Sequence, residues 1–231
     1  MRKVRSARPA PTRSTIDKND FAYYCNERLY PVKDLVVEAG YRKQKSRYDI
    51  NFRDFMDLRV SLRSSTRYEK DAYRFSANYG ICGTANVFMS YGKGFRFPAT
   101  DEFVIPGYSF GPNTNPVPTE INRDLKPQTT KEFNVGLRWN PWYRLSGTVT
   151  YFQSRNRDEI LYNPRSPNFL FGGNDNYPRT RREGLETSLF LNIAGGLALN
   201  VTYSYTEARF GGGQYADNRI PLVPQNKGSA R

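Results

Sequence analysis

The chain has 231 residues, a formal net charge of +13, a mean hydropathy of −0.74 and 15% aromatic residues. No apolar run approaches the ~18 residues of a membrane-spanning helix, and disordered chains are poor in the aromatic residues that are abundant here. The chain contains no His, which excludes histidine-based catalysis and histidine ligation of haem by this segment.

The first 18 residues are basic, and we expect them to form a disordered N-terminal segment. Met1–Ser14 is followed by no apolar core, so it does not resemble a secretory signal, and we expect no export signal in this chain. Residues 19–231 are predicted to form one β unit. The remaining positive charges are dispersed, which argues against nucleic-acid binding.

Four pairs of segments alternate between apolar and polar residues. Period-two alternation of this length is typical of half-buried strands. In chain order the pairs are Phe21–Leu29 with Leu35–Arg42, Tyr73–Tyr79 with Ala85–Tyr91, Phe133–Trp139 with Tyr143–Tyr151, and Leu185–Leu191 with Leu197–Tyr205. The chain ends inside a ninth segment. We therefore predict an all-β, antiparallel, up-and-down sheet of about eight strands plus the start of a ninth.

The connections between these segments alternate in length. Inside each pair the turn is short, whereas the links between pairs are predicted to be long loops. These long links are about Lys43–Lys70, Gly92–Thr130, Ser154–Thr180 and Glu207–Leu222. Short turns at one end and long loops at the other are typical of outer-membrane β-barrels.

The two faces of the predicted strands differ in polarity. Val135, Leu145, Leu189 and Val201 fall on one face, which carries aromatic residues at both strand ends, as a lipid-facing wall does. The other face is predicted to line a wet lumen. Its charged residues include Arg42, Arg74, Arg138, Arg144 and Glu186. A soluble sandwich with one solvated face stays open as an alternative.

Four segments resemble conserved phrases of TonB-dependent outer-membrane receptors. They are Tyr91–Glu102 (YGKGFRFPATDE), Asn122–Leu137 (NRDLKPQTTKEFNVGL), Arg182–Glu186 (REGLE) and Ile220–Pro224 (IPLVP). Arg123 and Gln128 depart from the Pro and Glu that are usual in the second phrase. The resemblance implies a 22-stranded barrel with an N-terminal plug, which takes up ferric siderophores or similar scarce ligands with energy from TonB.

The same resemblance defines what this chain lacks. No plug domain is found, so TonB would act only through a domain absent here, and eight or nine strands cannot close a 22-stranded barrel. We therefore expect an incomplete fragment that does not transport alone, from a parent protein of the Gram-negative outer membrane. The alternative is a small closed eight-stranded outer-membrane barrel with a structural or adhesion role.

Candidate ligand contacts lie in the predicted loops. Arginine and tyrosine side chains suit an anionic, aromatic chelate through charge and stacking, although contact with lipopolysaccharide phosphates or with solvent fits equally well. The residues are Arg155, Arg157, Tyr162, Tyr177 and Arg179. The expected partners are the lipid bilayer, lipopolysaccharide and a ferric siderophore or similar ligand.

No catalytic or metal-binding pattern is found, and no cofactor is expected. The chain has no Gly-x-Ser-x-Gly elbow and no readable pair of catalytic acids, so we do not expect an enzyme. Cys25 and Cys82 match no metal or redox spacing. Cys25 falls on the first predicted strand and Cys82 in the turn between the third and fourth, at least about 10 Å apart at ~4.8 Å per strand, so we expect two free thiols.

Overall fold

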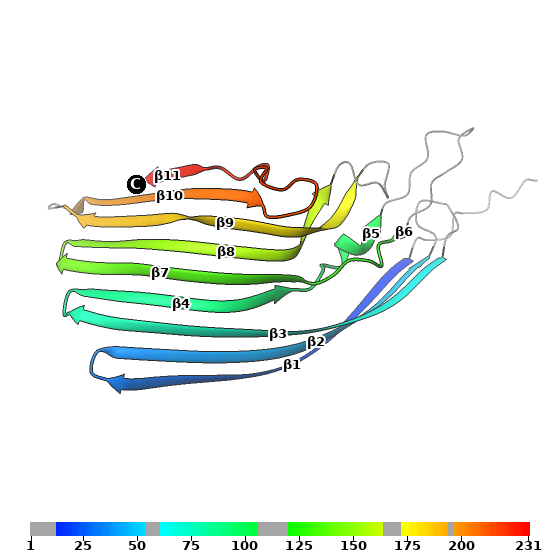
Figure 1. Ribbon diagram of the computed structural model, residues 1–231, viewed down its shortest axis with the longest axis horizontal. Coiled ribbons are helices and arrows are strands. Elements are labelled where there is room, and N and C mark those ends of the chain that lie inside the picture. Colours follow the sequence, from blue (N-terminus) through cyan, green and yellow to red (C-terminus); the bar gives the residue numbers. More distant parts are fainter. Residues whose placement is uncertain (1–12, 54–60, 106–119, 164–171, 194–195) are drawn as a thin grey trace, which may run out of the picture.

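The computed structural model describes residues 13–53, 61–105, 120–163, 172–193 and 196–231. Nine antiparallel strands form one sheet in the order β1-β2-β3-β4-β7-β8-β9-β10-β11, and β5 pairs with β6 in a second, two-stranded sheet (Figure 1). The strands of the large sheet are β1 (Arg13–Val32), β2 (Leu35–Arg53), β3 (Ser61–Cys82), β4 (Ala85–Arg96), β7 (Gln128–Trp142), β8 (Leu145–Asn163), β9 (Gly173–Asn192), β10 (Ala198–Phe210) and β11 (Asn226–Ala230). Between β4 and β7 lie the 3₁₀ helix η2 (Asp101–Phe103), β5 (Val104–Ile105) and β6 (Glu120–Ile121).

The sheet is open. Within the described residues β1 and β11 are its two edges and do not pair with each other. The alternative of a closed eight-stranded barrel is therefore wrong for this structure. None of the described residues belongs to a helix that is long and apolar enough to cross a membrane.

All four predicted hairpins are confirmed. Val135 pairs with Tyr151 across β7 and β8, and Leu189 pairs with Val201 across β9 and β10. The predicted ninth strand is β11. Cys25 in β1 and Cys82 at the end of β3 are both free thiols, as expected.

The strands extend much further than predicted. Most of Lys43–Lys70 and of Ser154–Thr180 was expected to form loops, but β2 continues to Arg53, β3 begins at Ser61, β8 continues to Asn163 and β9 begins at Gly173. The predicted disordered segment also differs, since its last six residues, 13–18, belong to β1 and its other residues lie outside the described ones. The predicted turn residues Ala194 and Gly195 likewise lie outside the described residues.

Side chains alternate between two faces along the whole sheet. Directly paired residues share a face, and the register places even-numbered residues such as Arg138, Thr148 and Ser188 on one face and odd-numbered residues such as Leu137 and Val149 on the other. We call the even-numbered side the inner face and the odd-numbered side the outer face. Two places differ: β11 is shifted by one residue, since Ala230 pairs with Val201, and β8 changes side after Asp158. The predicted sidedness of Val135, Leu145, Leu189 and Val201 is confirmed, because all four lie on the outer face. Many outer apolar side chains are exposed to more than a third, including Leu29, Phe75, Tyr79, Met89, Leu137, Leu185 and Leu189.

Aromatic rings cover glycines on the paired strand. Phe88 lies opposite Gly136, and Phe152 lies opposite Gly184. A Cβ atom at either glycine would collide with the ring beside it and with a backbone carbonyl. Both glycines belong to the family-like phrases noted in the sequence, and close approach of a ring explains why a side chain does not fit there.

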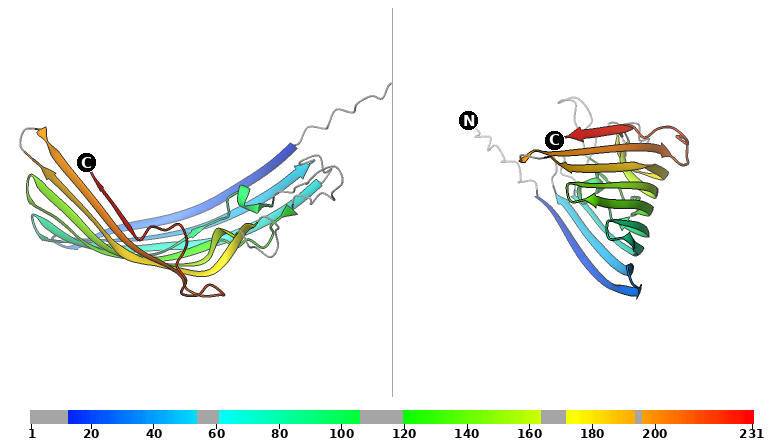
Figure 2. Two further views of the ribbon diagram at one scale, coloured as in Figure 1. Left: turned by 90° about the horizontal axis from the view of Figure 1, so that it is seen from above. Right: turned by 90° about the vertical axis from the view of Figure 1, so that its left-hand side faces the viewer.

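The sheet is bowed along its strands, and β5 and β6 lie on its hollow side (Figure 2). The main apolar cluster lies on the same side, since it joins the even-numbered Tyr48 and Ile50 of β2 to Phe103 of η2. The inner face is therefore the hollow face in this half of the sheet. Below, the end of the strands that carries η2, β5 and β6 is called the loop half.

Candidate functional site

The described parts of the connection between β4 and β7, residues 97–105 and 120–127, fold over the inner face in the loop half. Tyr48, Phe103 and Leu125 are almost completely buried, and the rings of Tyr48 and Phe103 lie 5.2 Å apart. Tyr48 donates a hydrogen bond to the carbonyl of Pro98 at 2.9 Å, and Tyr68 donates one to the carbonyl of Leu125 at 2.6 Å. Burial raises the pKa of Tyr68 to about 12. These two hydrogen bonds anchor the connection to β2 and β3 of the sheet.

A charged corner fixes the start of this connection. The guanidinium Nη1 of Arg96 lies 2.8 and 3.0 Å from the two carboxylate oxygens of Glu102, and the backbone N–H of Ala99 donates to the same carboxylate at 2.7 Å. Phe97 is buried beside this corner and stacks on Tyr68. The Tyr91–Glu102 phrase therefore encodes the turn that directs the chain over the inner face.

Asparagine side chains fix the end of the connection to β8 and β9. The side-chain amide of Asn176 exchanges hydrogen bonds with both backbone groups of Lys126, at 2.7 and 3.0 Å, and also donates to the carbonyl of Asp158 at 2.7 Å. Asn122 donates to the carbonyl of Asn174 at 2.9 Å. The end of the connection is thus hydrogen-bonded to β8 and β9, whereas the tyrosines described above bind it to β2 and β3.

The inner face also carries a buried ionic network. Arg182 donates hydrogen bonds to the two carboxylate oxygens of Glu159, from Nη2 to Oε1 at 2.7 Å and from Nη1 to Oε2 at 3.0 Å. The hydroxyl of Thr180 donates to the same carboxylate, and Asn156 donates to it at 3.4 Å. Asp158 has a positive φ of 54°, so alternation breaks there and Glu159 points to the same side as Asn156. The carboxylate is therefore satisfied within the chain.

The five predicted ligand residues do not form one site in the structure. Arg155, Arg157 and Arg179 line one recess of about 780 Å³. Tyr177 is stacked against Phe210 instead, with ring centroids 5.2 Å apart, and Tyr162 is exposed near the end of β8. The three arginines lie on the outer face, because each pairs with another odd-numbered residue of the sheet.

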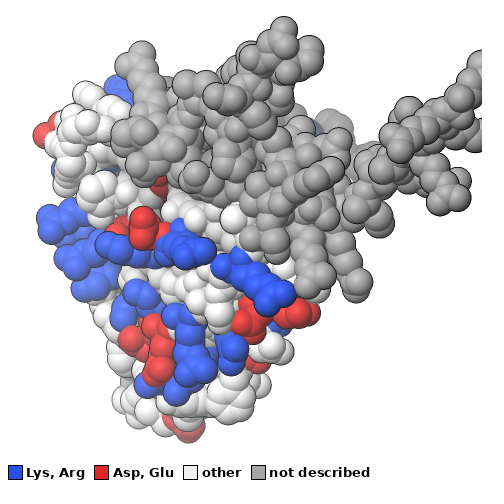
Figure 3. Space-filling view, turned by 90° about the vertical axis from the view of Figure 1, so that its right-hand side faces the viewer, with Lys and Arg blue, Asp and Glu red and all other residues white. Residues whose placement is uncertain are grey.

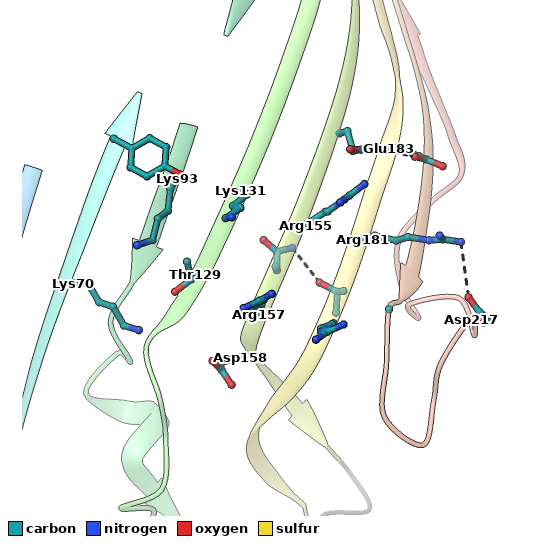
Figure 4. A pocket seen from close by; sticks show the side chains of 16 residues that line it. Lys70, Lys93, Thr129, Lys131, Arg155, Arg157, Asp158, Arg181, Glu183 and Asp217 are labelled. Carbon is teal, nitrogen blue, oxygen red and sulfur yellow. Dashed lines mark hydrogen bonds and ion pairs between the residues drawn. The ribbon is translucent and has the colours of Figure 1, made fainter. Parts of the chain in front are cut away.

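Further cations in this recess were missed by the sequence prediction. Lys93, Lys131 and Arg181 come from β4, β7 and β9 and lie beside the predicted arginines (Figure 4). Seen from the loop ends of the strands, Lys and Arg side chains gather in a band (Figure 3). The signal that could have found them is their distance from the outward apolar residues: Lys93 and Lys131 lie two residues from Tyr91 and Phe133, and Arg181 lies four residues from Leu185.

That the predicted lumen-facing residues line a lumen stays a prediction, but the structure shows on which face of the sheet they lie. Arg42, Arg74, Arg138 and Glu186 all lie on the inner face, and the guanidinium of Arg138 stacks over the ring of Phe88 at 5.3 Å. The position of Arg144 differs from the predicted one on a strand. It lies in the turn between β7 and β8, with its guanidinium 5.1 Å from the ring centroid of Tyr143, because β8 begins only at Leu145. No group of three or more potential metal ligands is found among the described residues.

Comparison with known proteins covers nearly the whole chain. The family model described as "TonB dependent receptor-like, beta-barrel" matches residues 3–231. Among curated relatives, the probable hemoglobin and hemoglobin-haptoglobin-binding protein 3 of Haemophilus influenzae is 26% identical over 204 residues, which cover 77% of this chain and 18% of the relative. The hemoglobin and hemoglobin-haptoglobin-binding protein B of the same species is 28% identical over 183 residues, covering 70% and 16%. The chain thus spans less than a fifth of the length of these relatives.

Solved structures share the fold at low sequence identity. The copper transporter OprC superposes with a TM-score of 0.72 at 15% identity, covering 91% of this chain and 31% of that one. The ferric citrate transporter FecA gives a TM-score of 0.72 at 14% identity, covering 98% and 32%. The ferric yersiniabactin uptake receptor FyuA from Yersinia pestis gives 0.68 at 14% identity, covering 95% and 32%.

Proposed function

The chain belongs to the TonB-dependent receptor β-barrel family, and we propose that it forms one sector of the wall of an outer-membrane receptor that takes up a scarce iron-carrying ligand. In this proposal the sector is part of a 22-stranded barrel, and a plug domain outside this chain receives energy from TonB. The observation that carries the proposal is the opposite polarity of the two faces over nine strands. An exposed apolar outer face suits lipid, and a polar inner face suits a wet passage.

The inner face supports a role in shaping that passage. The described parts of the β4–β7 connection, residues 97–105 and 120–127, are hydrogen-bonded onto it by Tyr48, Tyr68 and Asn176 and lie over the inner face. We infer that the connection narrows the entrance of the barrel from the external side. The assignment of Arg155, Arg157 and Arg179 to the transported ligand stays a prediction, and their outer-face position favours a different partner.

Two ligand classes are proposed. Ferric siderophores follow from the family resemblance, and a haem-carrying protein follows from the names of the curated relatives. The chain has no His, so in the second case it would provide no histidine ligand to haem iron and would contact the protein carrier instead. This chain is not proposed to catalyse a reaction.

Growth under iron limitation tests the proposal. Cells that express the receptor containing this chain would receive ferric citrate, a hydroxamate siderophore, a catecholate siderophore, haem or haemoglobin as the only iron source. We expect growth on one of these sources in cells with TonB and none in matched cells without TonB. Growth that does not depend on TonB, or on the receptor, would refute uptake by this route.

A further inference from the structure

The outer face carries one charged residue where every other strand is uncharged. We call the outward, odd-numbered positions between the loop-end aromatic or leucine residue and the short turn the apolar band of a strand. In β2, β3, β4, β7, β8, β9 and β10 the band comprises the odd positions of 35–41, 73–81, 85–91, 133–139, 145–151, 185–191 and 199–205, and none of them is charged. In β1 the band comprises the odd positions of 23–29, and it contains Glu27.

The orientation of Glu27 follows from unbroken strand register. β1 and β2 pair residue by residue from their loop ends down to Leu29, and the register shifts only between Leu29 and Val32. Glu27 lies directly opposite Ala39, which in turn lies opposite Phe75 of β3. Since paired residues share a face, the side chain of Glu27 points outward together with that of Phe75. No bulge turns this carboxylate to the inner face.

The described residues offer Glu27 no cation. Its carboxylate makes no hydrogen bond or ion pair with any of them. Arg28 points to the inner face and pairs with Glu38 at 2.5 Å. Lys43, the nearest outward cation of β2, lies four positions beyond the residue opposite Glu27, about 13 Å along the strand, and pairs with Glu69 at 2.6 Å. An unpaired charge that faces lipid is unfavourable, and ionisable residues at such positions usually have a partner.

The open side of Glu27 is the edge of the sheet. β1 pairs with β2 on one side, and among the described residues no strand pairs with its other side (Figure 1). Backbone N–H and C=O groups along an edge in lipid need hydrogen-bond partners, because no water is present there to replace them. The edge therefore needs a neighbouring strand, and the carboxylate needs a positive charge. One occupant meets both needs, namely an antiparallel strand with a basic residue on its outer face.

We propose that the strand which pairs with the free edge of β1 carries an outward Arg or Lys directly opposite Glu27, and that the two side chains form an ion pair within the apolar band. The inference rests on the barrel proposed above, in which another strand of the receptor covers this edge. Directly opposite Cβ atoms of an antiparallel pair lie about 4.5–5.5 Å apart, so a long basic side chain reaches the carboxylate. Arginine suits the position best, since it forms paired hydrogen bonds with a carboxylate.

The ion pair specifies the register of this strand pair. The short turn after Val32 joins β1 to β2, so in an up-and-down barrel the strand on the other side is connected to β1 through the loop half. A long connection does not fix register as a tight turn does. A slip by two residues would keep the faces of the strand but separate the two charges, and each would then face lipid unpaired. A single polar pair in an apolar surface thus selects one register.

The sign of the effect of Glu27→Gln distinguishes a paired carboxylate from an unpaired one. With a partner, the substitution leaves a basic residue unpaired in the apolar band, and we expect the ratio of folded to unfolded receptor in urea to fall at least about tenfold. The receptor that contains this chain is used, and heat-dependent gel mobility reads the folded fraction. An unchanged or higher ratio would mean that Glu27 has no partner, and it would overturn the proposal.

Glu69→Gln is the matched control. It makes the same exchange on the outer face but outside the apolar band, where the carboxylate pairs with Lys43. We expect the ratio to change by less than about twofold, because exposed ion pairs contribute little. A fall as large as that of Glu27→Gln would show a general response to lost charge rather than a pair in the band, and would also count against the proposal.

Disulfide cross-linking locates the partner. In the receptor with Cys25→Ser and Cys82→Ser, Glu27→Cys is combined with single cysteines at successive outward positions of the strand on the free edge. Oxidation by copper phenanthroline joins thiols whose Cα atoms lie within about 7 Å. We expect one efficient cross-link, within a single receptor molecule, at a position where the unchanged receptor has Arg or Lys. A cross-link at an apolar position, only between two receptor molecules, or at none of the positions would overturn the proposal.

Charge exchange separates pairing from a general loss of folding. Glu27→Lys places two cations together and should lower the folded fraction further than Glu27→Gln. Replacing the basic residue at the cross-linked position by Glu in the same receptor should restore the folded fraction to within about twofold of the unchanged receptor. Absence of restoration would show that the two residues do not pair. None of these readouts involves a ligand or TonB, so a receptor that takes up no iron can still show the pair, and the pair can fail in a receptor that transports.

Discussion

In the loop half of the sheet, the inner face satisfies its buried charge from within the chain, whereas the outer face leaves cations without partners. Glu159 is contacted by Arg182, Thr180 and Asn156. Lys131 and Arg155, on the other face of the same strands, have neighbours of their own sign on both sides. The buried charge of the inner face is therefore neutralised by the fold itself, whereas the fold leaves these cations of the outer face without a carboxylate partner among the described residues.

The largest effect is expected when the inner network is opened. Glu159→Ala leaves Arg182 half-buried without its carboxylate, and removing one partner of a buried pair costs about 3–5 kcal/mol. Because Arg182 keeps 23% of its side chain exposed, we expect the lower end of that range. Urea unfolding of the refolded chain measures the loss.

Two further variants test whether the unpaired charge of Arg182 causes the loss of stability in Glu159→Ala. Glu159→Ala combined with Arg182→Met should recover part of the lost stability, because no unpaired charge then remains. Glu69→Ala removes an exposed carboxylate from the outer face, where it pairs with Lys43 at 2.6 Å, and should shift the unfolding midpoint far less. A midpoint shift as large as that of Glu159→Ala would remove the contrast between the faces.

The next effect concerns the ring-covered glycines of the inner face. A side chain at Gly184 would meet the ring of Phe152 and the backbone carbonyl oxygen of Tyr205. We expect Gly184→Val to destabilise the chain by about 1–3 kcal/mol through overpacking. Gly94→Val is the control, since an added Cβ at Gly94 meets no atom within 4 Å. Equal unfolding midpoints for the two variants would show that ring contact does not constrain Gly184.

The sequence predicted the membrane half of the sheet better than the loop half, for a physical reason. In the half of the sheet away from η2, β5 and β6, here called the membrane half because we propose that it lies in the bilayer, the outward residues are apolar, as Val135 and Leu189 are. Hydrophobicity therefore alternates along the strand there. Beyond the interface the outward residues become charged, as Lys43 and Glu69 are, and both faces then look polar although the backbone pairing continues. The strand extensions were therefore mistaken for loops.

The candidate site was predicted residue by residue but not as a surface. Arg155, Arg157 and Arg179 could be named from the sequence because all three fall in the segment Ser154–Thr180 that was predicted to be a loop. Lys93, Lys131 and Arg181 line the same recess, and strand register brings them beside these arginines. The inner network was not predictable either, because Glu159 turns inward only through the positive φ of Asp158.

A smaller effect is expected where the inner face anchors the β4–β7 connection. Tyr68→Phe removes the hydrogen bond to the carbonyl of Leu125 and should cost about 1 kcal/mol. Burial raises the pKa of Tyr68 to about 12 from its ordinary value of 10.0. The neutral phenol is therefore favoured in the folded chain, so its contribution to stability is complete below pH 10 and is lost as the pH rises toward 12.

Alkaline titration of tyrosine absorbance checks this sign. The difference between the unchanged chain and Tyr68→Phe should report one phenol that ionises near pH 12. Tyr151→Phe, on the outer face, is the control for unfolding, and we expect its midpoint to stay unchanged. A Tyr68 phenol that ionises near pH 10 would show that the connection does not bury it.

The smallest effect has the opposite sign and tests the comparison most directly. Lys131 lies between Lys93 and Arg155 with no acidic partner among the described residues, so neutralising it relieves repulsion on both sides. Lys131→Gln should therefore stabilise the chain by about 0.2–1 kcal/mol at low ionic strength. In 1 M salt the Debye length falls to about 3 Å, so the gain should vanish there. Urea midpoints at the two salt concentrations measure it. A loss of stability at low salt would mean that Lys131 already has a partner within the chain, and the outer face would then resemble the inner one.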